Sequence, residues 1–88
     1  MKHLIHEFST HILDGEGRRY VAAAFGAERA DGTWVGWIEF SSTDRDGATF
    51  RTDNETSQPN RRALEYWAAG LEPLYLDGAF ARAQGKLT

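Results

Sequence analysis

Asp31-Gly32 restricts the fold of this chain most, because the dipeptide lies between two stretches of alternating apolar and polar residues. In a two-residue hairpin loop both central residues adopt positive φ angles, which glycine and aspartate tolerate better than most residues. The sequence therefore predicts an antiparallel hairpin with strands over about 19–30 and 33–43.

A two-residue loop also sets the register, since it pairs Ala30 with Thr33. The pairs that follow are Phe25 with Ile38, Ala23 with Phe40, Arg29 with Trp34, and Gly26 with Trp37. Trp37 is then expected to cover the backbone of Gly26, and Arg29 to rest on Trp34. The predicted core face carries Val21, Phe25, Ile38, Phe40 and Phe50, and the opposite face carries Ala22, Ala24 and Gly26 with Tyr20 and Trp37.

Two further strands are predicted on either side of this hairpin. Leu4, Phe8 and Ile12 alternate with polar residues before a glycine-rich turn, which favours a strand over about 3–13, although the same spacing also suits a helix face. A second turn that ends at Gly47 is followed by Phe50, which favours a strand over about 48–55.

The hydrophobic period changes after Gln58. Apolar residues now recur at the spacing of one buried face of a helix, which predicts a helix over about 58–69. These residues are Ala63, Leu64, Trp67, Ala68 and Leu71. Ser57 is the expected N-cap, and Pro73 can open a second helix over about 73–83. We predict a single α+β domain over residues 1–88, with a four-stranded antiparallel meander and a carboxy-terminal helix pair on one sheet face.

The bulk composition excludes several classes of protein. A net charge of −3 and a pI of about 5.5 argue against a general nucleic-acid coat. The absence of cysteine excludes disulfides, thiolate catalysis and cysteine-ligated zinc. No apolar run has the length of a signal peptide core or a membrane span, so a cytoplasmic protein is expected.

Residues with catalytic or metal-binding chemistry form no motif. His3, His6 and His11 cannot chelate one metal along a single strand, because His6 faces away and the other two are too far apart. Glu39 and Glu55 would need burial and a partner to act as acid or base. We therefore expect no catalytic residue, no metal and no cofactor.

The segment 55–62 offers the sharpest functional hypothesis, because it places two arginines in the first turns of the helix predicted over 58–69. The amino end of a helix carries partial positive charge, so it disfavours cations at this position. A bound anion would compensate them, and so would a carboxylate such as Glu55 or Glu65. The residues that could hold a phosphate or carboxylate are Thr56, Ser57, Asn60, Arg61 and Arg62.

Three segments resemble a family of small uncharacterised bacterial proteins. They are DGTWVGWIEF at 31–40, ETSQPNR at 55–61 and ALEYWA at 63–68, within a match that spans roughly 20–83. The resemblance implies a bacterial cytosolic protein, and it carries no assigned activity.

The leading hypothesis is a small non-enzymatic module that binds a protein partner or a second copy of itself through an aromatic sheet face formed by Tyr20, Trp37 and Val35. The first alternative is an anion or single-stranded nucleic-acid binder at Ser57 to Arg62. A small enzyme is the third.

Overall fold

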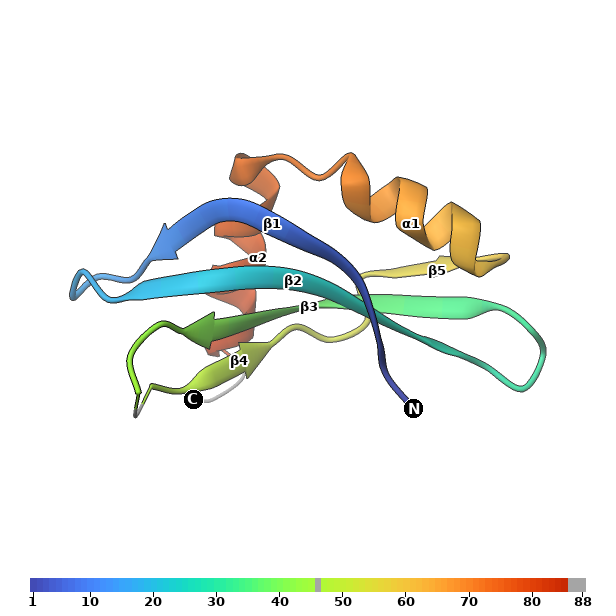
Figure 1. Cartoon of the computed structure of the whole chain (residues 1–88), viewed down its shortest axis with the longest axis horizontal. Helices are drawn as coiled ribbons and strands as arrows, with labels where there is room; N and C mark the ends of the chain where they lie inside the picture. Colours follow the sequence, from blue (N-terminus) through green and yellow to red (C-terminus); the bar gives the residue numbers. More distant parts are fainter. Residues whose placement is uncertain (46, 86–88) are drawn as a thin grey trace.

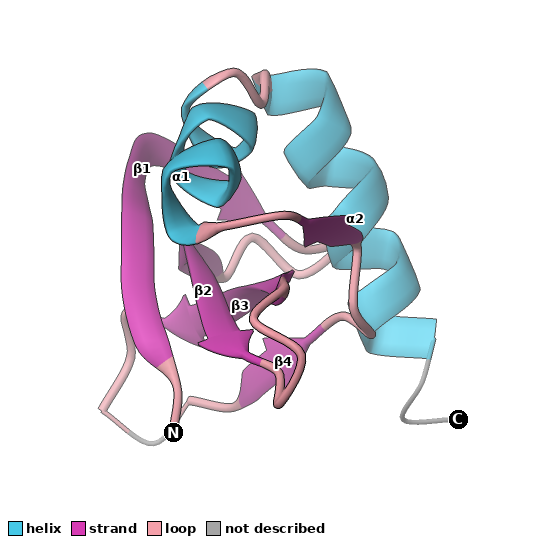
Figure 2. Ribbon diagram, turned by 90° about the vertical axis from the view of Figure 1, so that its right-hand side faces the viewer, coloured by secondary structure: helices cyan, strands magenta, loops and turns pink. Residues whose placement is uncertain are grey.

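The protein folds into an antiparallel sheet that is covered on one face by two helices (Figure 1 and Figure 2), as seen in a computed structural model that describes residues 1–45 and 47–85. The elements in chain order are β1 (His3–Leu13), β2 (Arg19–Glu28), β3 (Trp34–Ser42), β4 (Thr49–Arg51), β5 (Thr56–Gln58), α1 (Arg61–Ala69) and α2 (Pro73–Gly85). The predicted α+β fold, with its β1-β2-β3-β4 meander and two terminal helices on the sheet, is confirmed.

The hairpin between β2 and β3 forms around Asp31-Gly32, but its predicted register is wrong by one residue. Arg29 and Thr33 close the loop, where the Arg29 amide donates to the Thr33 carbonyl oxygen at 2.7 Å. Gly32 alone in this loop has a positive φ, of 89°, and the Asp31 carboxylate accepts from the Thr33 amide and hydroxyl. The loop therefore holds three residues instead of two, a common alternative hairpin geometry.

This slip reassigns the two faces of the sheet. The observed pairs are Ala22 with Phe40, Ala24 with Ile38, Phe25 with Trp37, Gly26 with Gly36, and Glu28 with Trp34. Because strand side chains alternate, the slip puts Phe25 beside Trp37 on the open face and Tyr20 on the helix face. Val21 is correspondingly exposed, so the predicted core places for Val21 and Phe25 are wrong.

The predicted strand over 48–55 is divided into two short strands that pair with different halves of β3. β4 pairs beside Glu39 to Ser41, and β5 pairs beside Trp34 to Gly36. Between them the buried Thr52 holds the chain to β3, since its amide donates to the Ile38 carbonyl oxygen and its hydroxyl accepts from the Ile38 amide. The segment thus crosses β3 without a continuous ladder.

The core lies between α2 and the helix face of the sheet. Tyr20, Phe40 and Phe50 surround Phe80 of α2, with ring centroids 4.9, 5.1 and 5.9 Å from the Phe80 ring. Smaller buried residues complete this layer: Ile12, Ala22, Ala24, Ile38, Ala68, Leu76, Ala79 and Ala83. Aromatic rings therefore supply much of the buried area of a small domain.

α1 packs on the other end of the same face, above the paired glycines of the hairpin. The fully buried Leu64 of α1 lies directly against Gly26 and Gly36. Leu64, not Trp37, therefore covers Gly26, and the missing Cβ atoms let the helix approach the sheet closely.

Asn60 is the N-cap of α1, so the expectations of Ser57 as the cap and of a helix that begins at 58 are wrong. The Asn60 side-chain oxygen accepts from the Ala63 amide at 2.8 Å. Gln58 is instead the last residue of β5 and pairs with Trp34. Both asparagine and serine cap helices well, so the strand pairing decides where the helix begins.

Replacing Asn60 by alanine is expected to lower the free energy of unfolding by about 1 kcal/mol, because the Ala63 amide loses its acceptor. Ser57→Ala serves as the matched control and is expected to change stability by less than about 0.5 kcal/mol. Urea denaturation of the two variants measures the difference. Equal losses in both variants would contradict the assignment of the cap.

Candidate functional site

The open face of the sheet, where Trp37 and Val35 were expected to form a partner surface, is largely covered by the protein's own side chains. Trp37 is 4% exposed and Val35 is 8% exposed. The guanidinium of Arg51 lies 4.0 Å from the Trp37 ring centroid, and the ammonium of Lys2 lies 4.5 Å from the Phe25 ring centroid. Two cations therefore cover the aromatic rings that would have been free to bind.

Glu39 holds the Lys2 part of this cover in place. Its carboxylate accepts from the Trp37 indole N–H at 2.9 Å and from the Lys2 ammonium at 3.0 and 3.1 Å. Tyr20, the third residue of the expected surface, is 2% exposed and lies in the core beneath α2. The three residues therefore do not form one exposed aromatic surface.

The residues of the predicted anion site lie near one another in the chain, but most of their polar atoms have partners within the protein. The Thr56 hydroxyl accepts from the Gln58 side chain at 2.7 Å, and the Ser57 hydroxyl accepts from Arg29 at 3.1 Å. Asn60 caps the helix. These groups point to different neighbours and do not converge on one ligand position.

Arg61 is compensated by a carboxylate one turn along α1. Its Nε lies 3.3 Å from a carboxylate oxygen of Glu65, and its guanidinium lies 5.6 Å from the Trp34 ring centroid. Arg61, not Arg29, thus rests near Trp34. Of the two carboxylates considered from the sequence, Glu65 is the one that pairs with an arginine of this turn, while Glu55 lies elsewhere.

Glu55 joins the chain before β5 to α2. It accepts from the Tyr75 hydroxyl and from the Arg82 guanidinium, and its side chain is mostly buried. The guanidinium of Arg82 also lies 5.6 Å from the Tyr75 ring centroid. This cluster anchors the crossing segment to the second helix.

Burial, together with hydrogen bonding to the neighbouring Glu55 carboxylate and its repulsion of the phenolate, raises the pKa of Tyr75 to about 12. In the unfolded chain the pKa of the Tyr75 hydroxyl is near 10.0, so this hydroxyl loses its proton at a lower pH than it does in the folded chain. Stability is therefore expected to fall as pH rises from about 10 to about 12, and to be unaffected by this group below that range.

Chemical denaturation of the native protein and Tyr75→Phe across this pH range tests the assignment. The native protein is expected to lose more stability than the variant between pH 10 and 12, because only the native protein carries the titrating hydroxyl. Parallel curves for the two proteins would show that Tyr75 ionises alike in the folded and unfolded states.

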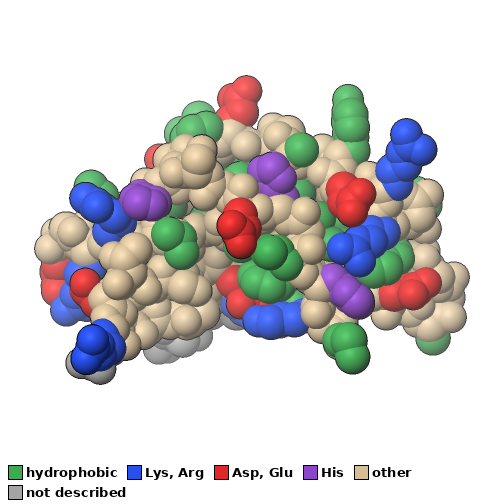
Figure 3. All heavy atoms as spheres, in the orientation of Figure 1, with side chains coloured by type: hydrophobic (Ala, Val, Ile, Leu, Met, Phe, Trp, Pro, Cys, Tyr) green, Lys and Arg blue, Asp and Glu red, His purple; other side chains and the backbone are tan. Residues whose placement is uncertain are grey.

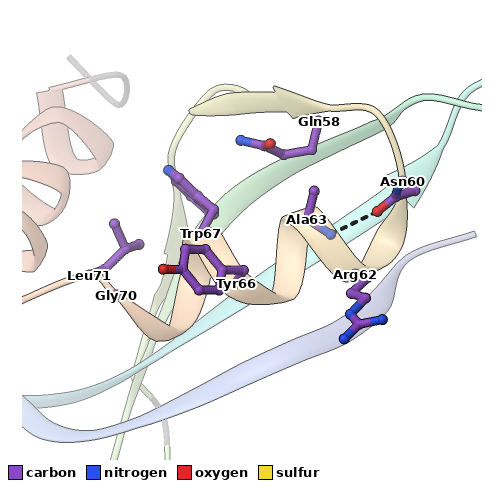
Figure 4. A pocket seen from close by; sticks show the side chains of 8 residues that line it. All are labelled: Gln58, Asn60, Arg62, Ala63, Tyr66, Trp67, Gly70 and Leu71. Atoms are coloured by element: carbon purple, nitrogen blue, oxygen red, sulfur yellow. Dashed lines mark hydrogen bonds between the residues drawn. The ribbon is translucent and has the colours of Figure 1, made fainter.

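A hollow of about 780 Å³ is lined by residues of β5, of α1 and of the turn that follows α1 (Figure 4). Apolar groups form most of its wall, and Tyr66 stands out beside it with 86% of its surface exposed. Its lining residues are Gln58, Asn60, Arg62, Ala63, Tyr66, Trp67, Gly70 and Leu71. Of the predicted anion-binding residues, only Asn60 and Arg62 belong to it.

A second hollow of about 470 Å³ continues the first across the connection between the helices. Both hollows share Gly70 and Leu71, and the second is completed by Glu72, Leu74 and Tyr75. Leu74 is 82% exposed. We give the name helix strip to the half-buried Leu71 together with the exposed residues Arg62, Tyr66, Gly70, Glu72 and Leu74.

Sequence reasoning missed the helix strip because it followed only the buried stripe of α1. Tyr66 and Leu74 are large apolar residues that fall outside the buried positions Leu64, Ala68 and Leu76. A large apolar residue on the polar side of an amphipathic helix is the signal that would have identified them.

No family model, curated protein or solved structure matches this chain. The resemblance of 31–40 and 55–68 to a small bacterial family therefore stays a prediction. None of the helices in the described ranges has the length and apolar character that crossing a membrane requires.

Proposed function

We propose that this protein is a small non-enzymatic module that binds another protein surface through the helix strip. The observation that carries this proposal is the exposure of Tyr66 and Leu74, at 86% and 82%, on either side of two adjoining hollows. The proposal keeps the class of function expected from the sequence, a protein-interaction module, and moves its contact surface from the sheet to the helices.

The energetics of burial support this surface. Covering a Leu side chain gains about 1.5–3 kcal/mol, and Tyr is among the residues that contribute most at interface centres. In the present structure Tyr66 and Leu74 gain little of this energy. Trp37, by contrast, already has Arg51 and Glu39 as partners, so a sheet-face partner would have to displace them.

The charge distribution favours protein over nucleic acid as the partner. Acidic, basic and hydrophobic side chains are interspersed on the face that Figure 3 presents, without a broad area of one charge. Arg61 is engaged by Glu65, which reduces its value for phosphate. A partner of the helix strip is expected to bind with little dependence on salt, unlike a phosphate ligand.

Site-specific photo-cross-linking tests the proposed contact surface. p-Benzoylphenylalanine at position 66 is expected to form a covalent adduct in the native host cells, because Tyr66 would lie within the interface. The same photoreactive residue at position 16, in the exposed turn after β1, is the matched control. No adduct at position 66, or equal adducts at both positions, would overturn the proposal.

A further inference from the structure

We infer that the sheet face left open by the helices carries a binding site for a lysine side chain of another polypeptide, and that Lys2 of the chain itself occupies this site. The inference goes beyond the proposed function, because it concerns the face opposite α1 and α2. The site consists of the Glu39 carboxylate and the Phe25 ring. Lys2 shows its chemistry directly, since its ammonium lies 4.5 Å from the Phe25 ring centroid and donates to both Glu39 carboxylate oxygens, at 3.0 and 3.1 Å.

The groups that form the site belong to interior strands of the sheet. Phe25 lies on β2 and pairs with Trp37 of β3, two residues before Glu39. The Trp37 indole N–H donates to Glu39 at 2.9 Å, and the Glu39 side chain is only 11% exposed. The carboxylate therefore keeps one hydrogen bond, and with it its orientation, when the Lys2 ammonium leaves.

Lys2 lies at the margin of the fold and is easily displaced. β1 begins at His3, so Lys2 lies outside the strand, and Met1 before it is fully exposed. The Lys2 side chain is 53% exposed. An ion pair with such an exposed partner favours the paired form only about one- to fivefold. A second ammonium can therefore compete with Lys2 for Glu39.

The charges around the site favour a cation as the ligand. Glu7 of β1 and Glu39 of β3 lie directly opposite Ala23 of β2, one on each side, and directly opposite residues point to the same face of a sheet. Arg51 of β4 continues this row beyond Glu39. When Lys2 leaves, the row carries two carboxylates and one guanidinium, so the complementary ligand is a cation.

A primary ammonium on a polypeptide matches the site better than other cations do. Its three N–H groups can donate to both carboxylate oxygens while its charge rests against the Phe25 ring. A quaternary ammonium has no N–H group and cannot form these hydrogen bonds. Leu4, directly opposite Phe25, is 46% exposed. The backbone that carries a lysine can cover Leu4 as well, which a small free amine cannot do.

Titration of the full chain with n-butylammonium, an analogue of the lysine side chain, tests the site at constant ionic strength. The NMR signal of the Trp37 indole N–H reports binding, because this group donates to Glu39. The native chain is expected to bind in the millimolar range, and Lys2→Ala to bind about two- to sixfold more tightly, because the internal competitor is gone. Equal affinity in the two proteins would overturn the inference.

Variants in the Lys2→Ala background show which groups hold the ammonium. Glu39→Gln is expected to weaken binding by roughly tenfold or more, because a charge-assisted hydrogen bond is lost. Glu7→Gln removes an equal charge from the same row and is the matched control, with an expected loss of less than about threefold. Equal losses in these two variants, or an equal response to tetramethylammonium, would overturn the inference.

Phe25→Leu gives a second test that does not alter the Glu39 carboxylate. It keeps an apolar side chain and removes the ring, so binding is expected to weaken while circular dichroism shows an unchanged fold. Unchanged binding of n-butylammonium in this variant would overturn the site.

Nα-acetyl-lysine methylamide tests the source of the ammonium in the Lys2→Ala protein. It is expected to bind at least as tightly as n-butylammonium, because its backbone can reach Leu4. Binding of n-butylammonium alone would assign the site to a free amine and overturn the polypeptide ligand. These results do not depend on cross-linking at position 66, so the proposed function stands or falls separately.

Discussion

Alanine at Gly36 is expected to destabilise the fold by about 1–3 kcal/mol, or more, because the added methyl group has no space beneath α1. A Cβ at Gly36 would lie 2.5 Å from a Leu64 methyl carbon, and one at Gly26 would lie 2.4 Å from the other. A Cβ added at Gly26 would also lie 3.0 Å from the Val35 carbonyl oxygen, so alanine is expected to be tolerated less well at Gly26 than at Gly36. Urea denaturation of each variant measures the loss.

The contact with Leu64 is tested by a double-mutant cycle. Leu64→Ala alone is expected to cost about 2–5 kcal/mol, since Leu64 is fully buried. In that background Gly36→Ala is expected to cost less than in the native chain, because the new methyl group enters the vacated space. Gly15→Ala, where an added Cβ meets nothing within 4 Å, is the control. Simple additivity would show that Leu64 does not set the requirement for glycine.

Phe80→Ala is expected to lower the free energy of unfolding by about 3–5 kcal/mol, a large share of the stability of a domain this small. Phe80 is 5% exposed and is the ring against which Tyr20, Phe40 and Phe50 pack. Its loss would leave a cavity between α2 and the sheet. Denaturation in urea and thermal unfolding measure the effect.

Leu74→Ala is the matched control for Phe80→Ala, because both residues belong to α2 and Leu74 is 82% exposed. In dilute solution this control is expected to change stability by less than about 0.5 kcal/mol. Similar losses for the two variants would contradict the division of α2 into a buried side and an exposed side.

The sequence predicted the kinds of elements well, because turns and hydrophobic periods act locally. Asp31-Gly32 identified the hairpin, and the period after Gln58 identified α1. The predicted strand register was wrong, because two loop lengths are compatible with the same local sequence. A three-residue loop accommodates Gly32 as readily as a two-residue loop does. The extra loop residue shifts the register by one position, and this shift exchanges the two faces of one strand relative to the other. Tyr20 and Phe25 were consequently assigned to the wrong sides.

The ends of α1 and the divided strand show a second limit. Ser57 and Asn60 are both good caps, and the pairing of Gln58 with Trp34 decides between them. The three-residue strand β5 leaves no periodic signal in the sequence, since a pattern needs more positions to be recognised. Strand pairing with residues far apart in the chain therefore determines where β5 lies and where α1 begins, and local sequence patterns do not reveal that pairing.

The candidate site was predictable in part. The sequence indicated that a carboxylate could compensate the two arginines at the start of α1, and the Arg61–Glu65 ion pair confirms this for Arg61. The cover of the aromatic sheet face was not predictable, because it depends on Lys2 and Arg51, which come from opposite edges of the sheet. Only the assembled fold brings those cations over Phe25 and Trp37.

Solvent exposure measured in solution shows most directly which surface of the protein is available for contact. A neutral paramagnetic cosolute, added to a dilute isotope-labelled sample, broadens NMR signals according to their exposure. We expect strong broadening of the Tyr66 ring and Leu74 methyl signals and weak broadening of the Trp37 indole N–H signal, because this N–H donates to Glu39 and Trp37 is buried. Strong broadening of the Trp37 signal with protection of Tyr66 and Leu74 would contradict this expectation.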